Sequence, residues 1–355
     1  MEKNQTIAIA AVAVLLVAGI SAFILLNSDS EESTGEFIDA RGRTVNVPGE
    51  IDSIYAIKSC SLELVSFFNA VNKVTFLDSN EVFNSGRTHN IMLNSLLKDL
   101  PTLNASSKET VAMKDIDVII SSTVDVTALN AEQSDYGKPV FAINADLEFD
   151  SPEFFDQLNL LGKLFKEEAR ATELVNGIKG FINDVKIPGT GSQKTGYYAG
   201  MMYYGGGQFY KASGNFVAFD YLNVRNIVSP AGNKQPYVVN KETILSQHMD
   251  YIFLDGTTVD ACKTTMLADA TALEVNTPEF RNVTYKLLVY KDWGTNWQNV
   301  LINTYYVSKV TTGAAWDFEA KANAILDLFY PDSTVDYAGL VAKLTGGGCA
   351  KVSFT

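Results

Sequence analysis

A pattern that occurs twice in the chain constrains its fold more than any other feature. The two copies are residues 108–120 (KETVAMKDIDVII) and 241–253 (KETILSQHMDYIF). Each begins with Lys-Glu-Thr, continues through a short helical stretch, and ends with an aspartate and an apolar, β-like run. A helix–turn–strand unit can recur by chance in any α/β protein. The identical start and equal spacing favour two similar lobes instead.

Short apolar strands alternate with helical segments in both halves of the chain. This alternation predicts parallel sheets covered by helices, and therefore an α/β fold. The strands are expected at residues 53–57, 74–77, 118–121 and 140–143 in the first half and at 195–200, 251–254 and 286–290 in the second. A helix is expected at 61–71, and a helical region at 299–329.

The segment 151–186 has helical spacing of apolar residues along its whole length. Ser151 is a suitable N-cap, and Pro152 suits the first helical position. The pattern predicts about 35 residues of helix, or about 50 Å if it is unbroken. A helix of this length between two α/β lobes is expected to act as a rigid spine.

Residues 7–26 (IAIAAVAVLLVAGISAFILL) form an apolar run long enough to cross a membrane. Lys3 precedes the run and acidic residues follow it, which favours an N-terminus inside the cell. A signal peptide cleaved after Ile20-Ser21-Ala22 is the alternative. Because the apolar run continues past Ala22, we expect an uncleaved anchor. No cysteine follows the run, so the usual lipoprotein anchor is excluded.

The predicted organisation has six parts. These are a cytoplasmic N-terminus (1–6), the anchor or signal segment (7–26), a polar tether (27–36), an N-terminal α/β lobe (37–150), the spine (151–187) and a C-terminal α/β lobe with terminal helices (188–355).

Composition and charge exclude several functions. The net charge of −13 argues against binding to nucleic acid, which needs a basic surface. His89 and His248 are far apart, and the cysteines lack metal-ligand spacing, so we expect no metal site and no cofactor. No set of residues suits nucleophilic catalysis, so we expect a protein that is not an enzyme. The sequence allows a disulfide between Cys262 and Cys349.

Residues 37–48 (FIDARGRTVNVP) resemble the "TDxxGRxVxVP" opening of the metal-chelate class of periplasmic binding proteins. Further segments resemble that family in the expected order: 54–64, 108–120, 197–226 and 296–306. After residue 309 the chain departs from the family's pattern. The resemblance implies two Rossmann-like lobes joined by one long helix, the class III arrangement. It also implies an extracytoplasmic protein that delivers an iron–siderophore, haem or corrinoid to an ABC permease.

Ligands of parallel α/β sheets bind beyond the carboxyl ends of the strands. In the first lobe, this rule points to Lys58, Ser59, Cys60, Asn80, Ser122 and Asn144. In the second lobe, it points to Asp255, to the segment 203–210 and to the segment 293–297.

The segment 203–210 combines glycines, which allow close approach of a ligand, with aromatic rings. Its candidates are Tyr203, Tyr204, Gly206, Phe209 and Tyr210, and the alternative is a glycine turn between core aromatics. In 293–297 the candidates are Trp293, Asn296 and Trp297. The alternative for this second segment is a helix cap and core packing.

The expected ligand is a neutral or weakly charged chelate, because the chain has only six arginines. One of these, Arg87, lies in a polar loop, and it is expected either to meet an anionic group of the ligand or to be a solvated surface residue. The rival interpretations are a two-lobed enzyme of the metallocluster or chelatase type and a protein that binds metal ions directly. Both need clustered metal ligands, which the sequence does not offer.

Glu109 and Glu242 occupy equivalent places in the two copies of the repeat. A glutamate in the first turn of a helix is favoured by the helix dipole, which is the simpler explanation. The family resemblance implies a further role, because the family places one surface glutamate on each lobe to meet arginines of a dimeric permease. We therefore expect Glu109 and Glu242 to dock the protein onto its permease.

Overall fold

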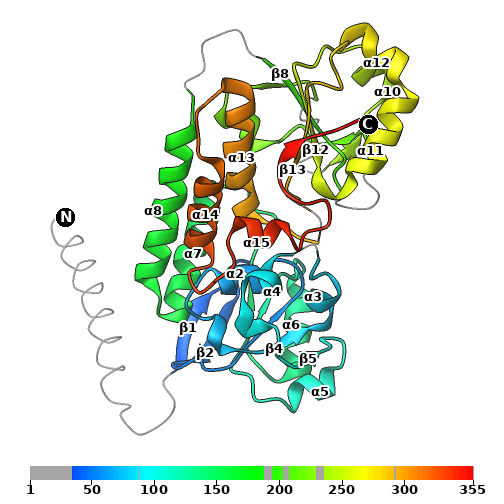
Figure 1. The fold of residues 1–355 in the computed structure, drawn as a ribbon. Helices are drawn as coiled ribbons and strands as arrows, with labels where there is room; N and C mark the ends of the chain where they lie inside the picture. Colours follow the sequence, from blue (N-terminus) through cyan, green and yellow to red (C-terminus); the bar gives the residue numbers. More distant parts are fainter. Residues whose placement is uncertain are drawn as a thin grey trace, which may run out of the picture.

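The computed structural model describes residues 34–86, 88–187, 194–202, 208–228, 236–291 and 293–354 and has two lobes joined by long helices (Figure 1). The predicted anchor at 7–26 lies outside these residues. In the described part of the chain, no helix combines the length and the apolar character that crossing a membrane requires.

The described chain begins with an antiparallel hairpin of β1 (Thr34–Ile38) and β2 (Thr44–Pro48). Asp39 closes the turn, because its Oδ1 accepts hydrogen bonds from the backbone N–H groups of Arg41 and Arg43 at 2.9 and 3.0 Å. The Arg43 guanidinium also pairs with Asp39 at 2.8 Å. Gly42 has a φ of +75°, which glycine adopts without strain. The Asp-x-x-Gly-Arg pattern of the sequence therefore builds this turn.

The first lobe contains a fully parallel sheet with the strand order β5-β4-β3-β6-β7. Its strands are β3 (Ile54–Ile57), β4 (Val74–Asp78), β5 (Thr102–Leu103), β6 (Val118–Ser121) and β7 (Val140–Ala142). Strands β3, β6 and β7 are buried along their whole length, as expected for strands covered on both faces. The strand order reverses between β3 and β6, which is where ligands bind in such sheets.

Short helices cover this sheet. They are α2 (Ser61–Ser66), α3 (Ser79–Phe83), α4 (Asn90–Leu93), α5 (Lys108–Ala112) and α6 (Val126–Tyr136), with the 3₁₀ turns η1 (Val71–Lys73) and η2 (Ser95–Leu97). The helix predicted at 61–71 therefore ends earlier than expected, at Ser66.

The second lobe contains a mixed sheet with the order β11-β9-β8-β12-β13-β14, in which β10 also pairs with β8. The parallel strands are β8 (Thr195–Ala199), β10 (Arg225–Asn226), β12 (Tyr251–Asp255) and β13 (Thr284–Leu287); the antiparallel ones are β9 (Lys211–Ala212), β11 (Tyr237–Val238) and β14 (Ala350–Lys351). Its helices are α9 (Val217–Tyr221), α10 (Lys241–Leu245), α11 (Val259–Ala268) and α12 (Ala270–Asn276), with the 3₁₀ turn η3 (Gly256–Thr258). The parallel centre matches the prediction, and the antiparallel strands lie toward the edges.

The two copies of the repeat make equivalent contacts in the two lobes. Asp117 accepts a hydrogen bond from the backbone N–H of Ser53 at 2.9 Å, just before β3. Asp250 accepts one from the N–H of Thr195 at 2.7 Å, at the start of β8. The aspartate of the repeat therefore ties together two neighbouring parallel strands in each lobe.

The lysine of each repeat also has a matched partner. Lys108 on α5 forms an ion pair with Asp135 of α6, and Lys241 on α10 forms one with Asp269, which ends α11. Both pairs join the short helix of the repeat to the helix that follows the next strand. The similarity of the lobes therefore extends to side-chain contacts.

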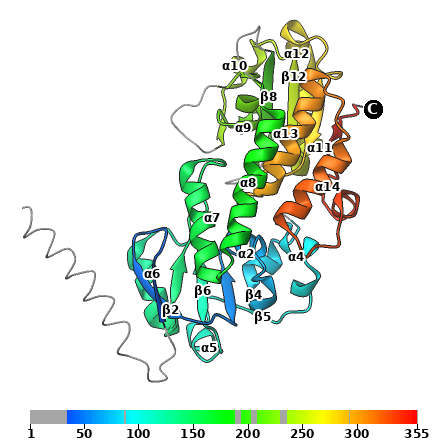
Figure 2. The ribbon, with the colours of Figure 1, turned by 90° about the vertical axis from the view of Figure 1, so that its left-hand side faces the viewer.

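The prediction of one 35-residue spine helix is wrong. The segment forms a helical hairpin of α7 (Pro152–Phe165) and α8 (Glu168–Val185), which lie side by side in Figure 2. Lys166 ends α7 with a φ of +58°, and the N–H of Glu167 donates to the carbonyl of Gly162 at 2.6 Å. A Cβ on Gly162 would lie 2.6 Å from the Cβ of Ala171, so small residues permit the close return. Of these two helices, α8, about 27 Å long, runs between the lobes.

The C-terminal helices α13 (Trp297–Thr312) and α14 (Phe318–Phe329) lie beside α8 in Figure 1, and α15 (Tyr337–Val341) follows them. Phe67 of the first lobe packs against Trp297, Phe329 and Tyr330, with ring centroids 4.8–6.2 Å apart. The hydrophobic core therefore continues from the first lobe into the C-terminal helices.

All three cysteines are free thiols, so the disulfide that the sequence allowed between Cys262 and Cys349 does not form. The two sulfur atoms have different neighbours. Cys262 Sγ lies 3.7 Å from Thr258 Oγ1, and Cys349 Sγ donates to Asn303 Oδ1 at 3.5 Å.

Candidate ligand-binding site

A cavity of about 350 Å³ lies between the two lobes. Its first-lobe wall is the segment 146–150, and its second-lobe walls come from residues 213–221 and from 290–295. The side chains that line it include Asp146, Glu148, Phe149, Asp150, Met201, Ser213, Asn215, Asp220, Tyr221, Tyr290, Lys291 and Thr295. Its size and its mixture of aromatic and polar groups are typical of small-molecule sites.

The first-lobe wall is held at the carboxyl end of β7. The N–H of Asn144 donates to Oε1 of Gln157 at 2.6 Å, and Gln157 Nε2 returns a bond to the Asn144 carbonyl at 3.2 Å. Asn144 Oδ1 in turn accepts from the N–H of Asp146 at 3.1 Å. Ser151 caps α7 by accepting from the N–H of Phe154 at 3.1 Å. These bonds fix both ends of the wall, so its side chains have a defined position.

The second-lobe walls carry the groups that face segment 146–150. Asp220 and Tyr221 lie in α9, and Lys291 and Thr295 form a short β-bridge ahead of α13. The ammonium of Lys291 pairs with the carboxylate of Asp146 at 3.2 Å. This ion pair connects the walls of the two lobes across the cavity.

The carboxyl groups around the cavity influence one another. Burial raises the pKa of Asp150, and partial burial together with the charges of Asp150 and Glu148 raises the pKa of Asp220. Burial and the nearby Asp150 also raise the pKa of the Tyr221 hydroxyl, and burial raises that of Tyr290 to about 12. The tyrosines are therefore neutral hydrogen-bonding groups at physiological pH.

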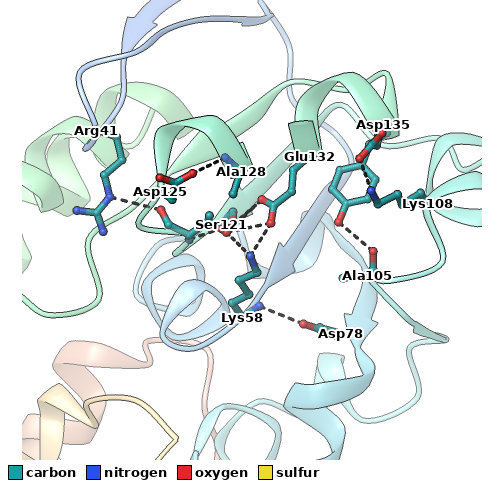
Figure 3. A network of polar contacts seen from close by, with 12 residues as sticks. Arg41, Lys58, Asp78, Ala105, Lys108, Ser121, Asp125, Ala128, Glu132 and Asp135 are labelled. Carbon is teal, nitrogen blue, oxygen red and sulfur yellow. Dashed lines mark hydrogen bonds and ion pairs between the residues drawn. The ribbon is translucent and has the colours of Figure 1, made fainter. Parts of the chain in front are cut away.

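Lys58, a candidate from the strand-end rule, lies where the strand order of the first sheet reverses. Its ammonium forms an ion pair with Glu132 and contacts the hydroxyl of Thr123. Its backbone N–H donates to Asp78 Oδ2 at 3.0 Å, and Arg41 Nε donates to the Thr123 carbonyl at 3.4 Å. Figure 3 shows Lys58 and Glu132 pointing toward one another. The charge expected to contact a ligand is therefore neutralised within the first lobe.

Ser59 and Cys60 lie where the two lobes touch. The N–H of Thr295 donates to Cys60 Sγ at 3.2 Å, and a Cβ on Gly294 would lie 2.5 Å from that sulfur. Cys60 is buried, and burial raises the pKa of its thiol well above the ordinary value. Cys60 thus packs the contact between the lobes as a neutral thiol.

The other strand-end candidates also have structural partners. Asn80 is exposed, and its amide lies 3.4 Å from Asp78 Oδ1. Ser122 is buried. Asp255 is fully buried and accepts a hydrogen bond from the Tyr198 hydroxyl at 3.1 Å.

The described aromatic candidates belong mainly to the core. Phe209 is fully buried against Tyr197, with ring centroids 5.3 Å apart, and the Tyr210 hydroxyl donates to Asp269 at 2.6 Å. Asn296 and Trp297 are buried at the start of α13. The core alternative therefore describes these four residues, whereas Trp293 is half-buried.

Among the described residues, none of the individually named ligand candidates lines the interlobe cavity, but Thr295 of the predicted segment 293–297 does. The predicted Arg87, Tyr203, Tyr204 and Gly206 lie outside the described residues. The sequence analysis missed the acidic wall, although its signal was present. The run Asp-Leu-Glu-Phe-Asp at 146–150 begins two residues after Asn144, which the strand-end rule had selected.

Glu109 and Glu242 are exposed in the first turns of α5 and α10. These helices lie toward opposite ends of the molecule (Figure 1). The structure therefore leaves both carboxylates accessible to a partner, and their position on the repeat is the same in the two lobes.

In the described ranges, no group of three or more His, Cys, Asp or Glu side chains is arranged to hold a metal ion.

Two α/β lobes, a connecting helix and a cavity between the lobes define the class of two-lobed solute-binding proteins. Residues 65–277 match the family of periplasmic binding proteins, and the chain belongs to this family. The family and its structural relatives are transport proteins and not enzymes, which confirms the prediction of a non-catalytic protein.

Several solved structures share this fold. A periplasmic solute-binding protein from Veillonella parvula DSM 2008 is 14% identical, with a TM-score of 0.66 over 86% of this chain and 95% of that one. A molybdate periplasmic binding protein from Haemophilus influenzae, bound to molybdate, is 15% identical (TM-score 0.62; 85% and 99%). A protein of an ABC-type Fe³⁺-hydroxamate transport system from Saccharomonospora viridis DSM 43017 is 17% identical (TM-score 0.53; 79% and 99%). No curated protein is detectably similar in sequence.

Proposed function

We propose that this protein captures an organic metal chelate in the interlobe cavity and delivers it to the permease of an ABC importer. The observation that carries the proposal is the cavity itself. It is enclosed by both lobes of a periplasmic binding protein, and its volume of about 350 Å³ suits a small organic ligand.

The lining of the cavity supports an organic ligand. Phe149, Tyr221 and Tyr290 offer aromatic faces, and Ser213 and Asn215 offer hydrogen-bonding groups. Such a combination fills the apolar surface of a ligand and orients its polar atoms. Proteins of the same fold include one bound to molybdate and one from a Fe³⁺-hydroxamate transport system, which is consistent with a metal-containing ligand.

Native mass spectrometry of the purified chain with a panel of siderophores, haem and corrinoids tests the proposal. We expect a one-to-one complex with a member of the panel. Tyr221→Ala should weaken this complex, because the ring lines the cavity, whereas Tyr285→Ala, on β13 away from the cavity lining, is the matched control. A panel without any binder, or equal loss in both variants, would count against the proposal.

We also propose that the protein works outside the cytoplasmic membrane, tethered by residues 7–26 as an uncleaved anchor. The support is the apolar run, which continues beyond the sequence at which a signal peptidase would cut. Intact-mass analysis of membrane-extracted protein should give the full chain. A mature N-terminus near Phe23 would contradict the anchor.

A further inference from the structure

Acidic side chains predominate around the interlobe cavity. Asp146, Glu148 and Asp150 lie on the first-lobe wall, and Asp220 faces the cavity from α9. Lys291 is the only lysine or arginine among the described lining residues, and Asp146 already pairs with it at 3.2 Å. The described lining therefore carries more carboxylates than ammonium groups.

The residues outside the described ranges do not change this conclusion. The segment 229–235 and residue 292 adjoin lining residues in sequence, and the segment 203–207 begins two residues after Met201. The only charged members of these segments are Lys234 and Asp292. If Lys234 were counted and Asp292 were not, the carboxylates would still outnumber the ammonium groups.

Tyr221 provides a second indication of a ligand. The residue is 4% exposed and lines the cavity, and its hydroxyl interacts with the carboxylate of Asp150 without forming a hydrogen bond of ordinary geometry. A buried hydroxyl whose only partner is poorly aligned gains from a ligand or water that completes its hydrogen bonding. The phenol oxygen accepts hydrogen bonds, so it suits the N–H or O–H donors of a cationic group.

The pKa values of the acids are consistent with a positively charged ligand. Partial burial and the charges of Asp150 and Glu148 raise the pKa of Asp220, and burial raises the pKa of Asp150. The charges of Glu148 and Asp150 therefore repel that of Asp220, and Lys186 offsets part of the charge of Asp150. A positive ligand relieves this repulsion, whereas a negative ligand increases it. The rings of Phe149, Tyr221 and Tyr290 can add cation–π attraction.

We infer that the interlobe cavity selects a ligand with net positive charge. This inference rests on the proposed function, within which the ligand becomes a cationic metal complex. It replaces the neutral or weakly charged chelate expected from the small number of arginines.

Three inert cobalt(III) complexes of closely similar size test the charge preference. Tris(ethylenediamine)cobalt(III) is a trication, tris(glycinato)cobalt(III) is neutral, and tris(oxalato)cobaltate(III) is a trianion. Titration calorimetry of the full chain in detergent at low salt should give affinities in that order, with at least a tenfold advantage for the trication over the neutral complex. The advantage should shrink at high salt, because exposed charges are screened.

Two neutralising variants connect the preference to the cavity. Asp220→Asn should weaken binding of the trication by roughly tenfold and leave the neutral complex unchanged. Asp150→Asn should do the same, and asparagine tolerates the left-handed backbone of residue 150, where φ is +63°. Asp332→Asn, an exposed acid beyond α14, is the control and should change nothing.

The outcomes separate this inference from the proposed function. Equal or tighter binding of the trianion would overturn the charge preference, as would binding of a siderophore from the panel without binding of the trication. Binding of spermidine, a polycation without metal, in the absence of binding by any metal complex would keep the charge preference and overturn the chelate function. Failure of the trication and of spermidine to bind would overturn the inference.

Discussion

The carboxyl group of Glu63 in α2 accepts a hydrogen bond from the backbone N–H of Trp297, the first residue of α13, at 3.0 Å. Glu63 is only 3% exposed, and burial raises its pKa well above the ordinary value. The bond therefore joins a neutral side chain of the first lobe to the start of a C-terminal helix that runs between the lobes. It satisfies one of the N–H groups that every helix leaves unpaired at its start.

Substitutions at Glu63 should separate hydrogen bonding from charge. Glu63→Gln keeps a carbonyl oxygen beside the Trp297 N–H and should change the free energy of unfolding by less than about 1 kcal/mol. Glu63→Leu leaves that buried N–H without a partner and should cost about 1–3 kcal/mol. Urea denaturation of both variants measures the difference. Equal stability of the two would show that the hydrogen bond contributes little.

Features that depend on consecutive residues could be predicted from the sequence, whereas contacts between residues far apart in the chain could not. The strands and the repeat were predicted because their signals lie in consecutive residues, such as the apolar run after Asp117 and the equivalent run after Asp250. The contact of Glu63 with Trp297 joins residues 234 positions apart, and no periodicity connects them. The break at Lys166 was missed because neither proline nor glycine marks it, and the close packing of Gly162 on Ala171 appears only after folding.

The candidate site shows the same limit. The strand-end rule named Asn144, which shapes the first-lobe wall of the cavity. It did not distinguish side chains that face the cavity from those that face the core. The position of a residue at the end of a strand does not determine how deeply its side chain is buried. Phe209 and Trp297 were selected for their aromatic rings, and both are fully buried in the core.

Trp297 should therefore be important for stability. Its ring packs between Phe67 and Phe154, with centroid distances of 6.2 and 5.5 Å. Trp297→Ala should lower the free energy of unfolding by about 3–5 kcal/mol, the usual cost of removing a large buried ring. Trp293→Ala should cost clearly less, because Trp293 is half-buried. Urea denaturation followed by circular dichroism compares the variants, and a Trp297→Ala protein as stable as the parent would contradict the core assignment.

His89 should make stability depend on pH. It is fully buried, and burial lowers its pKa to about 4 from an ordinary value of about 6.5. Between these values the unfolded state binds more protons than the folded state, so the contribution of His89 is present above pH 6.5 and is lost as pH falls toward 4. Since one pKa unit corresponds to about 1.36 kcal/mol, the loss approaches about 3 kcal/mol.

The measurement compares the parent with His89→Gln by urea denaturation at pH 7, 5.5 and 4.5. The raised pKa values of Glu63 and Glu81 act in the opposite direction, but both proteins contain these residues, so their effect largely cancels in the difference. The parent should lose more stability than the variant as pH falls. Parallel curves would contradict a buried neutral histidine.

Glu109 and Glu242 are proposed to dock the protein onto its permease. Both glutamates are exposed, and the ion pairs of Lys108 with Asp135 and of Lys241 with Asp269 hold their short helices in matched positions. Two equivalent carboxylates on two similar lobes suit a permease with two similar subunits. Charge pairing at such a surface mainly sets orientation and association rate.

Reversal of both charges, Glu109→Arg with Glu242→Arg, should abolish uptake of the ligand by cells while ligand affinity and thermal stability stay nearly unchanged. The matched control reverses two other exposed first-turn glutamates, Glu168 of α8 and Glu319 of α14, and should leave uptake intact. Uptake that survives in the first variant would refute docking through these residues. Loss of ligand affinity or stability in that variant would instead assign the two glutamates to the fold. A charge that acts only in docking does not affect the stability or the ligand affinity of the isolated protein.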